Sequence, residues 1–165
     1  MPETLRTATL LTATITLGLM AGLFYAYAGS VLPGLRTADD RTTVEVMQRF
    51  NAAIQNGLFG LLFLGALAAT ATGAFLFRGA DARPVFVPVV AALVLYALTL
   101  LITFAVNIPL NNRLARSGSA DRIADPAAVR AAFYGPWVRW NMVRTLTCAG
   151  AFGAACWALI QYGRL

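Results

Sequence analysis

Four long apolar runs without a charged residue dominate this chain, and each can cross a lipid bilayer as an α-helix. They cover residues 7–32, 52–77, 84–112 and 145–163. A helix needs about 20 predominantly apolar residues to span the hydrocarbon core. We therefore expect one membrane domain over residues 1–165, with spans at approximately 7–32, 55–77, 85–108 and 138–162. Pro33 and Gly34 should end the first span.

The composition excludes an ordinary soluble domain. Of the 165 residues, 59% are hydrophobic and only 12% are charged. A soluble helical bundle needs a polar outer face on each helix, and the second and third runs have none. The first run is also longer than the roughly 7 to 15 apolar residues of a secretory signal, so we expect it to be retained. The predicted fold class is all-α, an integral membrane four-helix bundle.

The net charge of +6 comes from arginine alone, because the chain contains neither lysine nor histidine. In a membrane protein such an excess reports the orientation of the loops rather than binding to nucleic acid. Nine arginines fall beside one common end of the four spans, and four fall beside the other. The positive-inside rule therefore predicts a multi-pass protein of the cell membrane, with its arginine-rich end in the cytoplasm and both termini outside.

An amphipathic helix should lead into the second span. Apolar residues recur with helical spacing between residues 40 and 55, and Thr37 or Asp39 is suited to cap the start of this helix. On its polar face, side chains three and four residues apart share one side. They are Gln48, Asn51 and Gln55.

A short helix should precede the fourth span. Asp125 followed by Pro126 has the residue types of a helix start, with a capping carboxylate and a proline in the first turn. The pair Gly135-Pro136 is typical of a break between elements. We therefore expect the short helix to end there and the fourth span to begin as a new helix.

The polar residues of the spans gather at one end of the bundle. Because successive spans run in opposite directions, the end of the first, the start of the second, the end of the third and the start of the fourth share one membrane face. The opposite face has almost nothing comparable. The polar set comprises Gln48, Asn51, Gln55, Asn56, Asn107, Asn111, Asn112, Trp137, Asn141 and Arg144.

The segment Asn107-Ile-Pro109-Leu-Asn111 places two amides and a proline at the end of an apolar helix. Pro109 removes the backbone hydrogen bond to the carbonyl of Ala105, so we expect it to bend or end the helix. The freed carbonyl and both amides then need partners. In one interpretation they form a binding site, and in the other they satisfy loop backbone around a helix terminator.

The segment from Trp137 to Arg144 is the second polar signal. On a helix, Trp137, Asn141 and Arg144 share one face, and Trp140 lies one turn from Arg144. Tryptophan and arginine are also common interfacial anchors. Asn141 and Arg144 lie deeper, where a polar group is a functional candidate. The partner of Arg144 is an amide, a carbonyl, a loop acid such as Glu45, or an anionic ligand.

Several chemistries are disfavoured by the residues present. The absence of histidine excludes histidine-ligated haem, the common histidine metal sites and a Ser-His-Asp triad. Neither a CxxC pair nor a P-loop occurs, so we expect no metal and no cofactor. Cys148 and Cys156 are too far apart along a helix to form a disulfide. No carboxylate lies within a span, which disfavours an ion-coupled transporter.

Taken in order, four motifs resemble the anthrone-oxygenase-like family of small four-span membrane proteins. They are the glycine-rich first span ending at Pro33, Gln48-x-x-Asn51, Asn107-x-Pro109-x-Asn111 and Trp137-x-x-x-Asn141-x-x-Arg144.

The resemblance implies the oxidation of a polycyclic anthrone by molecular oxygen to an anthraquinone, without a metal or organic cofactor. Arg144, Asn107 and Asn141 would then stabilise an enolate as the catalytic set. Trp137 or Trp140 would stack on the flat substrate, with Asn111, Gln48 and Asn51 completing the binding site. The base would be Glu45 or Asp39.

A non-catalytic function is the alternative. In this interpretation the polar cluster binds a lipid, a quinone or a partner subunit, and the lipid bilayer is the surrounding partner. The sequence is compatible with a monomer and with a homo-oligomer. It does not identify the natural substrate.

Overall fold

The computed structural model describes residues 3–165, and these residues form helices without any strand. In chain order the elements are α1 (Glu3–Ala26), the π-helix η1 (Tyr27–Val31), α2 (Leu32–Arg36), α3 (Asp40–Ala53), α4 (Gly57–Leu76), the 3₁₀-helix η2 (Ala80–Ala82), α5 (Arg83–Ile102), the π-helix η3 (Thr103–Asn107), α6 (Ile108–Arg116), the 3₁₀-helix η4 (Ala120–Arg122) and α7 (Pro126–Tyr162).

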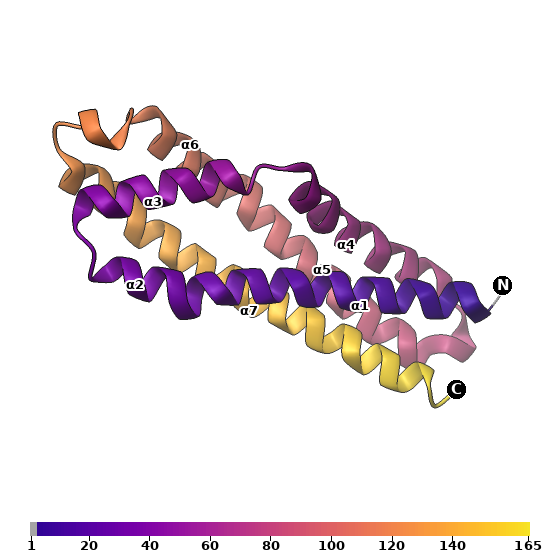
Figure 1. Cartoon of the computed structure of the whole chain (residues 1–165). Coiled ribbons are helices and arrows are strands. Elements are labelled where there is room, and N and C mark those ends of the chain that lie inside the picture. Colours follow the sequence, from indigo (N-terminus) through magenta and orange to yellow (C-terminus); the bar gives the residue numbers. More distant parts are fainter. Residues whose placement is uncertain (1–2) are drawn as a thin grey trace.

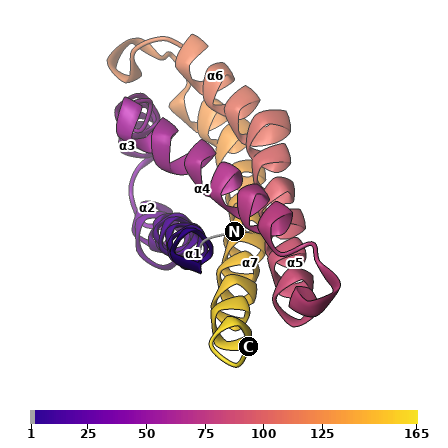
Figure 2. The ribbon, with the colours of Figure 1, turned by 90° about the vertical axis from the view of Figure 1, so that its right-hand side faces the viewer.

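Four of the helical segments are long and apolar enough to cross a membrane, which confirms the predicted number of spans. They are Glu3–Arg36, Gly57–Leu76, Ala80–Arg116 and Pro126–Tyr162. In the bundle, α1 packs on α4 and α7, and α5 packs on the same two helices. Figures 1 and 2 show this arrangement, with both described termini and η2 at one end and α2, α3 and α6 at the other.

The bundle is apolar outside as well as inside. Its centre is filled by buried side chains such as Leu17, Met20 and Tyr96, whose hydroxyl donates to the carbonyl of Phe63 at 2.8 Å. On the outer surface, large apolar side chains such as that of Leu61 are mostly exposed. In water this surface would be a large apolar patch, whereas in lipid it needs no cover. The protein is an integral membrane four-helix bundle.

The predicted break at Gly135-Pro136 is wrong, because α7 continues through Pro136 without interruption. The helix does begin as expected, with the Asp125 carboxylate accepting a hydrogen bond from the backbone of Ala128 at 2.9 Å. A proline clashes with the Cβ of the residue before it when that residue is helical, and glycine has no Cβ. Packing of Phe133 in the cluster with α2 and α3 holds this first part of α7 in place.

The prolines at 33 and 109 also fail to end their helices, which continue to Arg36 and Arg116. Each proline follows a π-helical turn by two residues. In these turns the backbone N–H of Leu32 donates to the carbonyl of Tyr27, and that of Ile108 donates to the carbonyl of Thr103. A π turn is one residue wider than an α turn, so it relieves the contact between a proline ring and the preceding turn.

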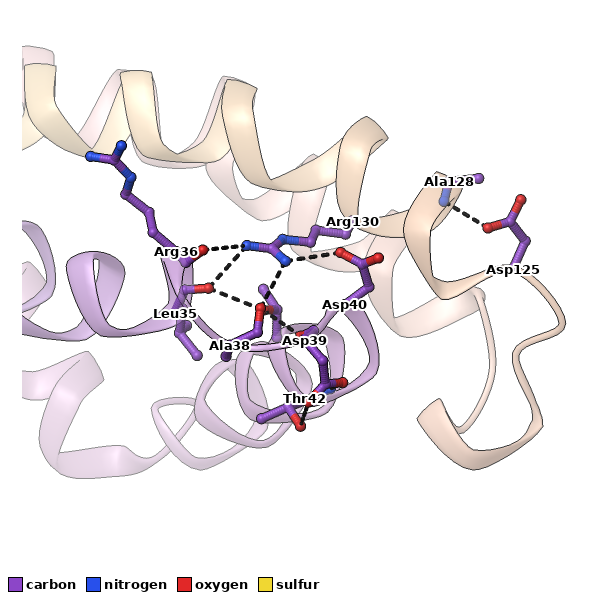
Figure 3. A network of polar contacts seen from close by, with 10 residues as sticks. Leu35, Arg36, Ala38, Asp39, Asp40, Thr42, Asp125, Ala128 and Arg130 are labelled. Atoms are coloured by element: carbon purple, nitrogen blue, oxygen red, sulfur yellow. Dashed lines mark hydrogen bonds and ion pairs between the residues drawn. The ribbon is translucent and has the colours of Figure 1, made fainter.

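The predicted amphipathic helix is α3, which packs on α6, η4 and the first part of α7. Of the two proposed caps, Asp39 is the one that forms. Its carboxylate accepts from the backbone N–H of Thr42 at 2.9 Å and from the Thr42 hydroxyl at 2.6 Å (Figure 3). These hydrogen bonds hold the pKa of Asp39 below its usual value, and the bond from the Thr42 hydroxyl has the larger effect. The cap is therefore a carboxylate at neutral pH, which suits the positive end of the helix dipole.

Arg130 of α7 joins the connection between α2 and α3 to the bundle. Its guanidinium donates to the carbonyls of Leu35 and Ala38, both at 3.0 Å, and forms an ion pair with Asp40 at 2.8 Å (Figure 3). A third carbonyl, that of Arg36, accepts at 3.3 Å. The Arg130 guanidinium thus satisfies the backbone carbonyls at the end of α2 and neutralises Asp40 at the start of α3.

Replacing Arg130 with alanine should destabilise the protein by about 2 to 3 kcal/mol, because it leaves partly buried carbonyls and Asp40 without their donor. Thermal unfolding of the purified protein in detergent measures the effect. Arg139→Ala is the control, since Arg139 is exposed on the same helix and bonds to no other described side chain. Equal unfolding temperatures for the two variants would contradict this role of Arg130.

Candidate functional site

The arginine-rich end of the bundle contains a cavity of about 300 Å³, between the ends of α1, α3 and α4 on one side and η3, α6 and α7 on the other. This volume is at the lower end of the range for small-molecule pockets. Its walls are mostly apolar or aromatic, with a set of polar groups. The lining residues are Leu23, Phe24, Tyr27, Asn51, Ile54, Gln55, Phe59, Gly60, Phe63, Leu64, Thr103, Phe104, Asn107, Ile108, Asn111, Asn112, Trp137, Asn141 and Arg144.

Two parts of the lining reach the molecular surface, and they differ in chemistry. Leu64 of α4 and Phe104 of η3 are more than half exposed, on the apolar side of the bundle. Gln55 and Asn112 are exposed at the polar end. We refer to these two parts as the apolar edge (Leu64, Phe104 and Ile108) and the polar edge (Gln55 and Asn112). The cavity therefore borders the lipid-facing surface and the polar end of the protein.

Arg144 is the central polar group of the cavity and is only 5% exposed. Its Nη2 donates to the side-chain oxygen of Asn141 at 2.9 Å, and its Nη1 donates to the hydroxyl of Thr103 at 3.3 Å. Its guanidinium also lies over two aromatic rings, 4.7 Å from the ring centre of Phe24 and 5.4 Å from that of Trp137. Hydrogen bonds and cation–π contacts thus hold the guanidinium, and all four residues that make them are uncharged.

No carboxylate neutralises Arg144 among residues 3–165. The proposed partner Glu45 pairs with Arg49 at 2.6 Å on the surface of α3, and Asp39 caps that helix. Neither acid lines the cavity. Of the partners expected for Arg144, the amide forms and the loop acid Glu45 does not, and both acids expected as the base lie outside the cavity. A buried cation without an acid is unfavourable by itself and attracts any negative charge that develops beside it.

Four polar atoms of the cavity lining are buried without a hydrogen-bond partner in the described structure. They are the Nε of Arg144, the side-chain nitrogen of Asn51, and both the nitrogen and the oxygen of the Asn107 side chain. An unsatisfied buried polar atom costs about 1 to 3 kcal/mol. Three donors and one acceptor without a protein partner therefore belong to residues that line the cavity. Asn107 also makes no bond to loop backbone, which contradicts its interpretation as a simple helix terminator.

Other polar residues of the lining, together with the neighbouring Thr145, hold the site in shape. Asn141 donates to the backbone carbonyl of Phe24 at 3.4 Å, and Thr145 donates to the same carbonyl at 3.2 Å. The indole nitrogen of Trp137 donates to the side-chain oxygen of Asn111 at 2.7 Å. These contacts join α1 to α7 and α6 to α7 around Arg144.

The structure brings together six of the eight residues predicted for the site, and they are Asn51, Asn107, Asn111, Trp137, Asn141 and Arg144. Gln48 and Trp140 do not line the cavity. Gln48 donates to the carbonyls of Leu114 and Gly118, both at 2.9 Å, because its side chain turns toward the end of α6. Trp140 points away from the cavity toward the surface, where it is 40% exposed.

Sequence reasoning missed the aromatic residues of the lining other than Trp137. Phe24 and Tyr27 at the end of α1, Phe59 and Phe63 in α4, and Phe104 in η3 all contribute. Each lies within an apolar run, where an aromatic residue is indistinguishable from an ordinary packing or lipid-facing residue. The spacing of Phe24 and Tyr27, one turn apart beside the polar end, was the available signal.

Replacing Asn107 with leucine should raise the stability of the ligand-free protein by about 1 to 3 kcal/mol, because two unsatisfied polar atoms give way to an apolar side chain of similar shape. Asn141→Leu is the matched control. It should lower stability, since Asn141 bonds to both Arg144 and the carbonyl of Phe24. The measurement is thermal unfolding in detergent. A loss of stability in both variants would show that Asn107 has a structural partner.

No curated protein and no solved structure matches the chain significantly. The family model described as Anthrone oxygenase matches residues 50–154, more than half of the chain. The matched segment includes Asn51, Asn107, Asn141 and Arg144, whereas Phe24 and Tyr27 lie before it. With a four-span bundle and a polar cavity at one end, the chain belongs to the anthrone oxygenase family.

Proposed function

We propose that this protein oxidises a lipophilic polycyclic aromatic of the anthrone type with molecular oxygen, and that it needs no metal or organic cofactor to do so. The observation that carries the proposal is the buried Arg144, a cation without a carboxylate in a cavity with aromatic walls. Such a site is suited to a neutral flat molecule that becomes an anion during the reaction.

Enolate formation is the step that the site favours. An anthrone has a methylene group between two aromatic rings and opposite the ketone, so loss of a methylene proton places negative charge on the ketone oxygen. Arg144, Asn107 and Asn51 line the cavity, and each has a buried donor without a protein partner in the described structure that could bond to this oxygen. Donors that are already in place in a site of low dielectric stabilise developing charge without reorganisation. The electron-rich enolate then reacts with oxygen directly.

The aromatic walls suit a flat substrate. Phe59 and Phe63 stack at 5.1 Å between ring centres on α4, and the rings of Tyr27 and Trp137 pack at an angle with their centres 5.7 Å apart. Aromatic rings offer a large apolar contact with preferred stacked or edge geometries. Trp137 is further fixed by its hydrogen bond to Asn111, so its ring is held in one orientation.

The apolar edge supports access from the bilayer. Leu64, Phe104 and Ile108 are exposed where the bundle faces lipid. A polycyclic ketone dissolves in the hydrocarbon core rather than in water, and both substrate and quinone product can cross this edge without entering water. This arrangement favours a lipophilic substrate over a soluble one.

The charge distribution supports a location in the cell membrane with the cavity at the cytoplasmic side. The arginines beside the cavity end, Arg144 included, are Arg36, Arg41, Arg49, Arg113, Arg116, Arg122, Arg130, Arg139 and Arg144. Only Arg6, Arg78, Arg83 and Arg164 lie in or beside the elements at the other end, which are the start of α1, the end of α4, η2, the start of α5 and the end of α7. Under the positive-inside rule the first group faces the cytoplasm.

A non-catalytic protein that binds an anionic lipid or a quinone, or that joins a partner subunit, is the second candidate. The unpaired Arg144 favours it, because a cation buried with neutral partners is stabilised by a permanent anion as well as by a transient one. The polar edge would then accommodate a lipid headgroup while the acyl chains stay at the apolar edge.

The test is to supply the purified protein in lipid nanodiscs with an anthrone and oxygen, and to follow quinone absorbance together with oxygen consumption. We expect a rate above the uncatalysed reaction and a loss of about 100-fold or more in Arg144→Met, in line with the removal of one oxyanion donor. Arg139→Met, which removes the same charge from an exposed position of α7, should keep the wild-type rate.

The outcomes separate the two candidates. A wild-type rate equal to that of empty nanodiscs would exclude the oxidation. Quenching of tryptophan fluorescence by a quinone or an anionic lipid in that case, lost in Arg144→Met, would support the binding function instead, since Trp137 lines the cavity.

A further inference from the structure

The proposed oxidation needs a group that takes a proton from the substrate, and the carboxylates expected for this task lie outside the cavity. We propose that Tyr27 is this proton-transfer group. The assignment rests on the proposed function, and it adds a catalytic residue that lies before the matched segment, residues 50–154.

Tyr27 and Arg144 are the two ionisable side chains among the residues that line the cavity. The hydroxyl of Tyr27 forms no hydrogen bond with another residue in the described part of the chain, so it is available to a ligand. Its ring is half-buried at the first position of η1 and is held on two sides. It packs at an angle against Trp137, 5.7 Å between ring centres, and edge-on against Phe50, at 6.1 Å.

Among the charged residues on the described elements around Tyr27, Arg144 is the one that lines the cavity and has no ion-pair partner among residues 3–165. From α7, Arg144 lines the same cavity, and both residues pack on Trp137: the ring of Tyr27 lies 5.7 Å from the Trp137 ring centre and the Arg144 guanidinium lies 5.4 Å from it. On α3, Arg49 and Glu45 neutralise each other on the surface, and Asp40 is bound to Arg130. On α1, the neighbouring lining residues are apolar. The Tyr27 phenolate therefore has a guanidinium as its counter-charge and no acid opposing it.

Sharing one cation lowers the cost of the proton transfer. In a site of low dielectric, the creation of a new charge is expensive, whereas the movement of an existing charge between two atoms near the same cation costs little. When a Tyr27 phenolate takes the substrate proton, the negative charge moves from the phenol oxygen to the enolate oxygen, within the cavity that Arg144 also lines. The net charge of the cavity is unchanged throughout.

The acidities of the two partners are also suited to exchange. An anthrone is the keto tautomer of a hydroxyanthracene, so its methylene is about as acidic as a phenol. Proton transfer is efficient when donor and acceptor are of similar strength. A carboxylate would be a much weaker base for this proton than the phenolate of Tyr27.

The complete reaction uses Tyr27 twice and balances with oxygen as the sole co-reactant. First, the phenolate takes one methylene proton, the C–H electron pair becomes the enolate, and the enolate carbon forms a C–O bond with oxygen. The resulting peroxide anion takes the proton back from Tyr27. Next, the phenolate takes the second proton from the same carbon. The C–H pair then forms the carbonyl, the O–O bond breaks, and the departing hydroxide takes the proton from Tyr27 as water.

The first experiment compares kcat and KM of Tyr27→Phe with wild type over a range of pH. We expect kcat to fall about 100-fold near neutral pH with little change in KM, as for loss of a general base. The deficit should shrink at alkaline pH, where the anthrone ionises in solution and needs no base. A structural defect would persist at every pH. Tyr25→Phe, at an exposed position of the same helix, should match wild type.

A second measurement covers the case in which Tyr27→Phe does not fold. Fluorinated tyrosine placed at position 27 keeps the shape of the residue and makes its phenol more acidic. The rise of kcat/KM with pH should therefore move to lower pH than in the protein with ordinary tyrosine. An unchanged profile would overturn the assignment.

The results distinguish this assignment from the function on which it rests. If the wild type does not oxidise the anthrone at all, the proposed function fails. If the wild type is active and Tyr27→Phe matches it at every pH, the oxidation stands and Tyr27 is not its proton-transfer group.

Discussion

The burial of Arg144 with neutral partners only is the constraint around which the polar end of the bundle is organised. Its guanidinium is held by Asn141, Thr103 and the faces of Phe24 and Trp137. Asn141 is in turn bonded to the backbone of α1, and Trp137 is bonded to Asn111 of α6. A buried charge of this kind lowers stability unless something else depends on it. The site therefore lowers the stability of the fold, as is typical of a functional site.

Much of this architecture could be predicted from the sequence, because the bilayer reduces the problem to length and polarity. The four spans and the shared polar end follow from charge-free runs and alternating direction. Asn107, Asn141 and Arg144 were identifiable because polar groups inside a span are rare. Asp39 and Asp125 were identifiable as caps since carboxylates before a helix have few other uses.

The remaining features depend on three-dimensional context. Proline rules describe an isolated helix, so they could not anticipate the π turns before Pro33 and Pro109 or the tolerance of Gly135-Pro136. Gln48 lies one turn from Asn51, yet its long side chain finds the carbonyls at the end of α6 instead. Tyr27 lies in an apolar run, and its position opposite Trp137 depends on how α1 and α7 pack.

The apolar edge of the cavity has a consequence for how affinity must be expressed. For any ligand that reaches the cavity from the hydrocarbon core, the relevant concentration is its mole fraction in the bilayer. Adding lipid or detergent at a fixed total amount of ligand dilutes the ligand around the protein. An apparent constant in molar units will then scale with the amphiphile present, so two preparations agree only when ligand is counted per lipid.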